Sequence, residues 1–272
     1  MKNKFKFTIP LAIALTLLAV IYQRGTGPTY PKKEKIGLEK NVKIKLPRSH
    51  GGETDALVEL PRLYPNMTAS LVYKRYPTKD DWHEKKFVSS GTLLTAKLPN
   101  QPPAGKLKYF IKINYGSGEQ LLGSESEPVM IRFKGDVPTT VLAPHVFFMF
   151  LSMFLSALAF FEALMKTDSY VRVGQMTFGC LVVGGLILGP VVQKYAFGVY
   201  WAGFPFDADL TDNKLLVGVL AWLFAVLMTW KAKRVWPVVI AATVLFGVYS
   251  IPHSMQGSEY DYEKGKVITD VD

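Results

Sequence analysis

The feature that most restricts the fold of this chain is a set of five long apolar segments. They lie at about residues 7–23, 144–165, 174–193, 214–230 and 235–251. About 20 mainly apolar residues suffice for an α-helix to cross a hydrocarbon core of about 30 Å, and a helix satisfies its own backbone hydrogen bonds in lipid. The sequence therefore predicts about five transmembrane helices, the last four of which form a bundle in residues 141–253.

The first apolar segment admits two interpretations. Residues 1–23 begin with Lys2, Lys4 and Lys6 and continue with an apolar core, which is typical of a membrane anchor and also of a signal peptide. Small residues are missing where a signal peptide would be cleaved, because residues 19–24 read AVIYQR. We favour an uncleaved N-terminal transmembrane anchor, with a signal peptide as the alternative.

Positive charges near the ends of the segments predict the orientation, since lysine and arginine are retained on the cytoplasmic side. Lys166 and Arg172 follow the second segment, and a basic stretch at 231–234 joins the fourth to the fifth. With five spans, residues 24–140 and an acidic tail at 254–272 are exported. The predicted location is a bacterial inner membrane, with the soluble domain and the C-terminus on the periplasmic side. The single cysteine excludes an intrachain disulfide.

Residues 24–140 alternate between apolar and polar side chains, as half-buried strands do. The pattern is clearest in NVKIKLP, GKLKYFIKIN and PVMIRFKG, which begin at residues 41, 105 and 128. About seven such strands, separated by Pro and Gly turns, predict an exported all-β sandwich of the immunoglobulin or fibronectin type III class. The predicted fold class is mixed: an α-helical membrane bundle with this sandwich inserted after its first helix.

The stretch PPAGKLKYFIKI, residues 102–113, resembles the strand-F region of fibronectin type III domains. This resemblance covers one strand and implies a binding or spacing role. Residues 24–140 contain 20 Lys and Arg against 12 Asp and Glu. Anionic membrane lipid is a partner that fits this charge, although lysines on the outward faces of strands also explain it. Nucleic acid is not an expected partner, because the basic residues are dispersed and the domain is exported.

Two features of the predicted bundle lie within its helices. Gly185 and Gly189 form a small-xxx-small pair, with Gly184 beside them, which allows another helix to approach closely. That helix can come from the same chain or from a second copy, so a homo-oligomer is an alternative. Glu162 stands four residues before Lys166, the spacing of a helical ion pair, and a proton-relay role is its alternative.

Residues able to carry chemistry are expected to gather at the outer ends of the helices. One histidine begins the second segment and another follows the fifth, while the loop YWAGFPFDADLTDNK, residues 200–214, returns to the same side. The tail adds further acids. The candidate site residues are His145, Trp201, Asp207, Asp209, Asp212, His253 and Glu259.

These residues suit more than one role. Two imidazoles and a carboxylate can bind a divalent metal, so His145, His253 and Asp207 are candidate ligands. The two histidines, on different helices, can also hold a b-type haem. Alternatively, Asp209 or Asp212 caps the fourth helix of the chain, and the aromatic residues form an interfacial belt.

The function predicted first is that of a membrane-anchored accessory or assembly protein, whose sandwich binds an exported or membrane protein partner over the outer face of the bundle. No catalytic residues are predicted, since the chain has no G-x-S-x-G, P-loop or H-E-x-x-H motif. The alternatives are a metal- or haem-binding component of a membrane electron-transfer system, using His145 and His253, and a membrane enzyme with an acid and histidine site on the outer face.

Overall fold

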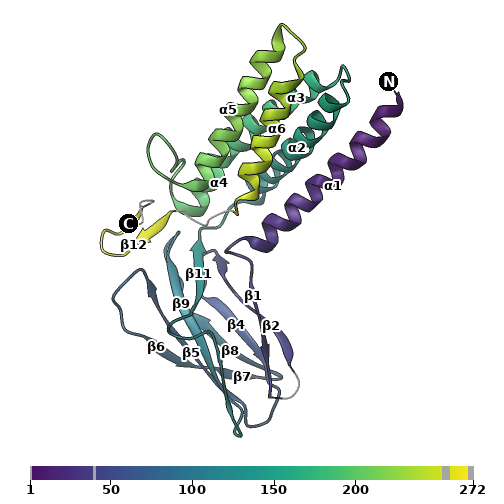
Figure 1. The fold of residues 1–272 in the computed structure, drawn as a ribbon. Helices are drawn as coiled ribbons and strands as arrows, with labels where there is room; N and C mark the ends of the chain where they lie inside the picture. Colours follow the sequence, from purple (N-terminus) through teal and green to yellow (C-terminus); the bar gives the residue numbers. More distant parts are fainter. Residues whose placement is uncertain (1, 39–40, 253–257, 269–272) are drawn as a thin grey trace. The chain divides into compact units, whose positions relative to one another are not determined.

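The computed structural model describes residues 2–38, 41–252 and 258–268 of the chain (Figure 1). The chain divides into two compact units. The helical unit comprises Met1–Pro28 and Val137–Gly257, and the β unit comprises Thr29–Asp136 and Ser258–Asp272. The C-terminal tail therefore belongs to the same unit as the strands.

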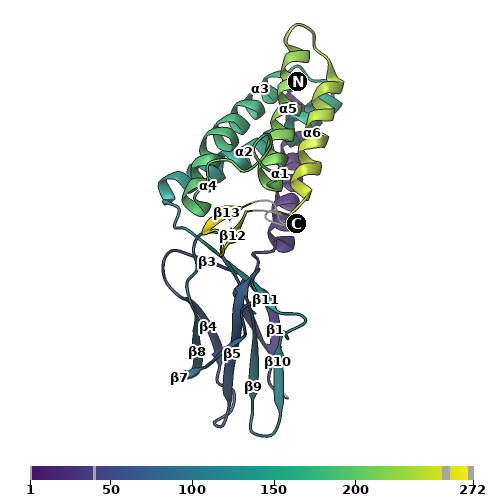
Figure 2. The same ribbon diagram turned by 90° about the vertical axis from the view of Figure 1, so that its left-hand side faces the viewer.

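The helices of the first unit lie side by side, as Figures 1 and 2 both show. They are α1 (Lys2–Thr26), α2 (Thr139–Leu164), α3 (Tyr170–Leu181), the π-helix η1 (Val182–Leu188), α4 (Gly189–Phe197), α5 (Leu210–Trp230) and α6 (Val235–Ser250). The segment from Tyr170 to Phe197 is one continuous helix. Its π-helical part ends two residues before Pro190, whose ring would clash with a carbonyl four residues earlier in a regular α-helix.

Among the described residues, four helices are long and apolar enough to cross a membrane. They are Phe7–Thr26, Thr139–Leu164, Tyr170–Phe197 and Leu210–Trp230, and α6 is a shorter apolar helix of 16 residues. The sequence predicted about five spans, so the last of them is shorter than a typical span. The length and composition of the four long helices indicate membrane association.

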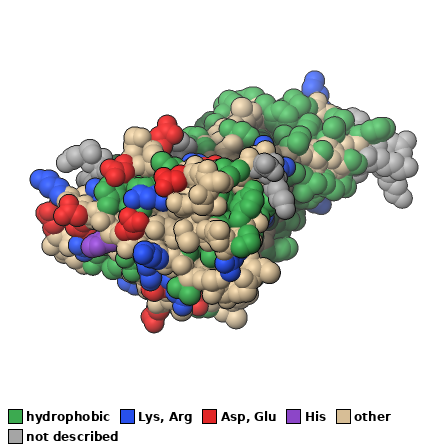
Figure 3. All heavy atoms as spheres, turned by 90° about the horizontal axis from the view of Figure 1, so that it is seen from below, with side chains coloured by type: hydrophobic (Ala, Val, Ile, Leu, Met, Phe, Trp, Pro, Cys, Tyr) green, Lys and Arg blue, Asp and Glu red, His purple; other side chains and the backbone are tan. Residues whose placement is uncertain are grey.

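The outer surfaces of these helices are apolar. Side chains as large as Phe7, Leu18, Phe147, Leu227 and Trp230 are more than half exposed. Figure 3 shows hydrophobic side chains over most of the visible helical surface, whereas acidic and basic side chains are interspersed over the β unit. Such large exposed apolar surfaces are unfavourable in water and are expected where a helix faces lipid.

The β unit contains several sheets. Its strands are β1 (Lys32–Ile36), β2 (Val42–Leu46), β3 (Ser49–Gly51), β4 (Ala56–Pro61), β5 (Thr68–Tyr76), β6 (His83–Lys86), β7 (Val88–Ser90), β8 (Leu93–Leu98), β9 (Lys106–Asn114), β10 (Glu119–Leu122), β11 (Val129–Lys134), β12 (Glu259–Asp261) and β13 (Lys266–Ile268). The largest sheet has the order β3-β11-β9-β5-β6, with β10 also paired to β9. The strands β4-β8-β7 form a second sheet, while β1-β2 and β12-β13 are two-stranded.

One hydrophobic core holds the main sheets together. Leu46, Leu60, Leu98, Leu107 and Phe133 are fully buried members of it and come from five different strands. Alternation explains this arrangement, because every second side chain of a strand points to the same face. The mixed composition of helices and β-sheets predicted from the sequence is therefore confirmed.

Candidate functional site

Asp209 caps helix α5. Its Oδ1 accepts hydrogen bonds from the backbone amides of Thr211 at 2.7 Å and Asp212 at 3.3 Å. The first amides of a helix lack partners within the helix, and an aspartate at this position supplies one. The carboxylate of Asp209 is thus used inside the chain.

Asp212 fixes the fold of the preceding loop. Its Oδ2 accepts the amide of Ala202 at 2.7 Å, and Asn213 accepts the amide of Phe204 at 2.7 Å. The loop lies so close to α5 that a Cβ at Gly203 would stand 2.6 Å from the Cβ of Asp212. Two of the three acids in the loop therefore hold the loop against the helix.

Asp207 and Trp201 are more accessible. Among the described residues, the side chain of Asp207 accepts one hydrogen bond, from the neighbouring amide of Ala208. Trp201 donates from Nε1 to the carbonyl of Phe204 at 3.1 Å. Phe204 and Phe206 are 68% and 80% exposed, as expected of aromatic residues at a membrane interface.

His145 contacts the π-helix. Its Nδ1 lies 2.8 Å from the carbonyl oxygen of Gly184. A carbonyl can only accept, so Nδ1 carries the proton in this contact and Nε2 of the neutral ring keeps a free lone pair. A histidine oriented in this way by a backbone carbonyl is typical of a metal or haem ligand.

The remaining candidates do not join His145 in a described cluster. His253 lies outside the described residues, and Glu259 belongs to the β unit, where it forms an ion pair with Lys106. Within the described ranges, no group of three or more His, Cys, Asp or Glu is arranged to hold a metal ion.

Glu162 is fully buried. It accepts hydrogen bonds from Thr8 at 2.5 Å, from Ser169 at 2.6 Å and from Thr167. The ion pairs among the described residues do not include Glu162 with Lys166, so the predicted pair is wrong. Helix α2 ends at Leu164 and Lys166 has a positive φ of 48°, which removes the helical spacing on which that pair depended.

The glycines of the π-helix lie against neighbouring helices. A Cβ at Gly185 would be 2.4 Å from Cδ1 of Leu215, and one at Gly184 would be 2.7 Å from the Cβ of Phe148. At Gly189 the nearest atoms would be 3.7 Å away or more. The closest approach to another helix backbone is therefore at Gly184, where the amide nitrogen of Met149 would be 3.2 Å away.

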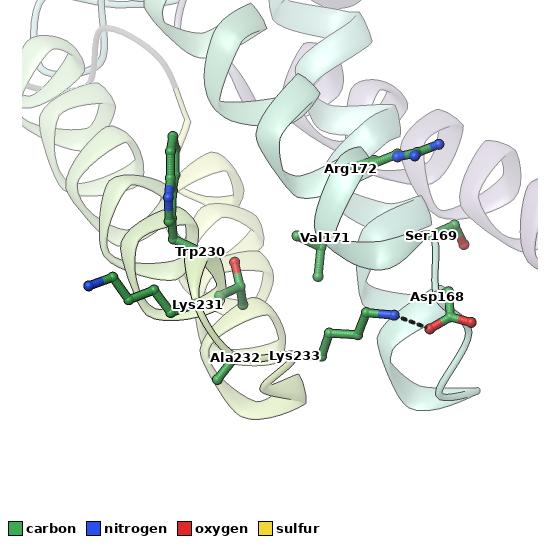
Figure 4. Close-up of a pocket in the computed structure, with 9 residues that line it drawn as sticks. Asp168, Ser169, Val171, Arg172, Trp230, Lys231, Ala232 and Lys233 are labelled. Carbon is green, nitrogen blue, oxygen red and sulfur yellow. Dashed lines mark hydrogen bonds and ion pairs between the residues drawn. The ribbon is translucent and has the colours of Figure 1, made fainter.

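A pocket of about 680 Å³ lies between the start of α3 and the end of α5. Lys233 points across it to Asp168, with 2.5 Å between Nζ and Oδ1, whereas Arg172 and Lys231 point away from each other (Figure 4). This contact lowers the pKa of Asp168 and raises that of Lys233. The cations of the pocket therefore do not converge on one point.

The sequence analysis missed a basic surface on the outer face of the six-stranded sheet. The inward side chains of β5 and β9 form the core, so the alternate ones point outward. The outward set contains Lys74, Lys86, Lys106, Lys108, Lys112 and Arg132, with Tyr76 and Phe110 among them, and one acid, Glu84, which forms an ion pair with Lys112 at 3.0 Å. We call these residues, together with Trp82, the cationic face. Only strand register shows that these lysines are neighbours, and the sequence pattern does not contain it.

Comparison with known proteins adds no assignment. No protein-family model matches the chain, and no curated protein matches it in sequence.

Proposed function

We propose that this chain is an accessory or assembly protein of a bacterial inner membrane, in which a periplasmic β-sandwich binds a partner protein. The sandwich is of the immunoglobulin or fibronectin type III kind, and the helices form its transmembrane anchor. The observation that carries the proposal is the cationic face, a set of outward lysines and aromatic rings on a rigid sheet. Aromatic side chains and arginine are enriched at protein interfaces, and a surface of one charge attracts a partner of the opposite charge.

The helical unit supports this assignment through what its polar residues do. Asp209 and Asp212 bind main-chain amides, and Lys214 donates to the carbonyls of Ile251 and Pro252 at 2.8 and 3.2 Å. These side chains stabilise loop and helix ends. An anchor needs no further chemistry from them.

A cysteine-labelling experiment tests the orientation. In a Cys180→Ala background, single cysteines replace Ser90 in β7, Lys264 in the tail and Ala232 between α5 and α6. A membrane-impermeant maleimide should label the first two in intact spheroplasts, and Ala232→Cys only after permeabilisation, because basic loops are retained in the cytoplasm. Labelling of Ala232→Cys alone in intact spheroplasts would refute a periplasmic sandwich.

A photo-crosslinking experiment tests partner binding. A photoreactive residue at Lys108, on the cationic face, should give a discrete crosslinked product in cells, and the same residue at Lys43, on β2, should not. Identical products from both positions would argue against a specific binding surface there.

A second candidate function is a metal- or haem-binding component of a membrane electron-transfer system. The orientation of His145 favours it, since Nε2 is left free to bind. An ultraviolet–visible spectrum with and without dithionite, together with elemental analysis, tests it on the wild type and on the His145→Ala and His253→Ala variants. A Soret band or stoichiometric metal that both substitutions abolish would support this candidate. A colourless, metal-free protein would exclude it.

A further inference from the structure

We propose that the cationic face is a docking surface for an extended, acidic, tyrosine-containing protein segment, and that residues 258–263 of this chain occupy one end of it. This inference rests on the proposed function and specifies the chemistry of the partner.

Cations face each other across the strands of this sheet. Lys74 of β5 lies directly opposite Lys108 of β9, and Lys106 lies opposite Arg132 of β11. Like charges in directly opposite positions destabilise a sheet. Bound carboxylates would remove that repulsion, so the face favours an anionic ligand.

The C-terminal tail shows which kind of ligand fits. Glu259 is 2% exposed and forms an ion pair with Lys106, and the guanidinium of Arg132 donates to the carbonyl of Ser258. The hydroxyl of Tyr262 donates to Oε1 of Gln101 at 2.9 Å. The carboxylate of Glu259, the carbonyl of Ser258 and Tyr262 thus bind at the end of the sheet that carries the opposed cations Lys106 and Arg132.

The next part of the face carries Lys74 and Lys108, and Nζ of Lys74 donates to the main-chain carbonyl of Asp80 at 3.3 Å. Neither Lys74 nor Lys108 takes part in the ion pairs formed among the described residues. Lys108 Nζ lies 4.2 Å from the ring centroid of Tyr76, and Lys74 Nζ lies 5.1 Å from that of Trp82. Cation–π contacts of this kind hold the lysines in place.

Aromatic rings supply the second part of the recognition. Trp82 packs edge-on against Phe110, with 5.2 Å between the ring centroids. Phe110 itself is 3% exposed, so the half-buried rings of Trp82 and Tyr76 are the ones that a ligand can reach. A tyrosine of a ligand can stack on these two rings, and pairs of aromatic rings add about 0.5–1.5 kcal/mol to a contact. The tail supplies both acids and tyrosines in its sequence SEYDYE, and we infer that a partner segment of similar composition binds next to it.

Fluorescence anisotropy on the full-length protein in neutral detergent tests the inference. The probe is a labelled peptide of sequence SEYDYE. The Lys74→Ala/Lys108→Ala variant should bind it about tenfold more weakly than the wild type. The matched control is Lys35→Ala/Lys43→Ala, which removes another directly opposed lysine pair, on β1 and β2, and it should bind within about twofold of the wild type.

Four results would overturn the inference. Unchanged binding in Lys74→Ala/Lys108→Ala, or equal weakening in both variants, would show that these lysines form no specific site. If a peptide with serine in place of both tyrosines binds the wild type with the same affinity, aromatic rings take no part in recognition. Displacement of the probe by phosphatidylglycerol micelles at lower concentrations than by unlabelled peptide would assign the face to lipid headgroups.

Thermal melting of both variants checks that they remain folded. Because the binding assay uses purified protein, its result does not depend on the orientation in the membrane. If the peptide fails to bind while cysteine labelling supports export, this inference fails and the proposed anchoring function remains.

Discussion

At the scale of single residues, the acids that look most like a site are mainly structural. Asp209 and Asp212 bind the amides of Thr211 and Ala202, and Glu162 binds three hydroxyl groups. Buried carboxylates are stable in a fold when donors surround them. Each of these acids thus has hydrogen-bond donors within the chain.

Replacing Asp209 with alanine should lower the free energy of unfolding by about 1 kcal/mol, because the cap of α5 is lost. Asp209→Asn should retain most of that stability, since the amide oxygen still accepts. Chemical unfolding of the purified protein in detergent measures both changes. Asp207→Ala is the control, and an equal loss in that variant would show that Asp209 is not acting as a cap.

Replacing Glu162 with alanine should cost at least about 2 kcal/mol, because the buried hydroxyl of Thr8 and the half-buried hydroxyls of Thr167 and Ser169 lose a shared acceptor. Lys166→Asn should cost less than about 0.5 kcal/mol, as Asn tolerates the positive φ at that position. The same unfolding measurement compares the two variants. A larger loss of stability in Lys166→Asn than in Glu162→Ala would contradict the structure and indicate an ion pair between the two side chains.

At the scale of elements, the π-helix η1 between α3 and α4 determines how closely α2 approaches. The carbonyl of Gly184 in this π-helix meets Nδ1 of His145. Helices in a membrane associate through close packing of small residues, since lipid gives no hydrophobic drive between them. The packing at this position is therefore sensitive to a single methyl group.

Gly184→Ala should destabilise the helical unit by about 1–3 kcal/mol, because the new Cβ meets Phe148 and the backbone of Met149. Gly185→Ala should cost less, since the flexible end of Leu215 can move aside. Gly179→Ala, with no atom within 4 Å of the added Cβ, should be neutral or stabilising. Melting temperatures in detergent rank the three, and an equal loss for Gly179→Ala would contradict a packing effect.

The tail hairpin, β12 with β13, should respond to alkaline pH through Tyr262. Burial raises the pKa of Tyr262 to about 12. The folded state therefore favours the neutral phenol, and its contribution to stability is complete below pH of about 10 and is lost as the pH rises through 12. The tyrosinate absorbance of the wild type minus that of Tyr262→Phe should titrate near 12, and a midpoint near 10 would show an exposed tyrosine.

At the scale of the whole molecule, the two units differ in surface and in what stabilises them. The β unit buries a core of alternating strand residues, while the helical unit keeps many apolar side chains exposed. Helix α1 belongs to the helical unit through Ala12, which is fully buried, and through the hydrogen bond of Gln23 with the carbonyl of Tyr249 at 3.1 Å.

If α1 is an anchor, protein purified from membranes should retain it, and residues 1–272 then contribute a mass of 30.4 kDa. Mass spectrometry of protein extracted from membranes measures this directly. The Ile21→Ala/Gln23→Ala variant creates a small-x-small motif of the kind that signal peptidases cleave. Loss of mass in that variant alone would show that the end of α1 is on the exported side, where signal peptidase can cleave it. A shortened wild type would identify α1 as a signal peptide.

Local patterns in the sequence determined much of the fold. Apolar length predicted the four long helices, period-two alternation predicted β2, β9 and β11, and an aspartate before an apolar helix predicted a cap at Asp209 or Asp212. These signals are readable because each depends on residues close together in the chain.

The tertiary structure alone decided which distant residues meet. Thr8 reaches Glu162 across 154 positions, and Lys106 meets Glu259 across 153. The placement of Lys74 opposite Lys108 depends on strand register, which a one-residue slip would abolish. Long-range pairing thus produces the buried site of Glu162, the contact of the tail with the sheet, and the cationic face. No local pattern in the sequence shows which strand or helix becomes a neighbour.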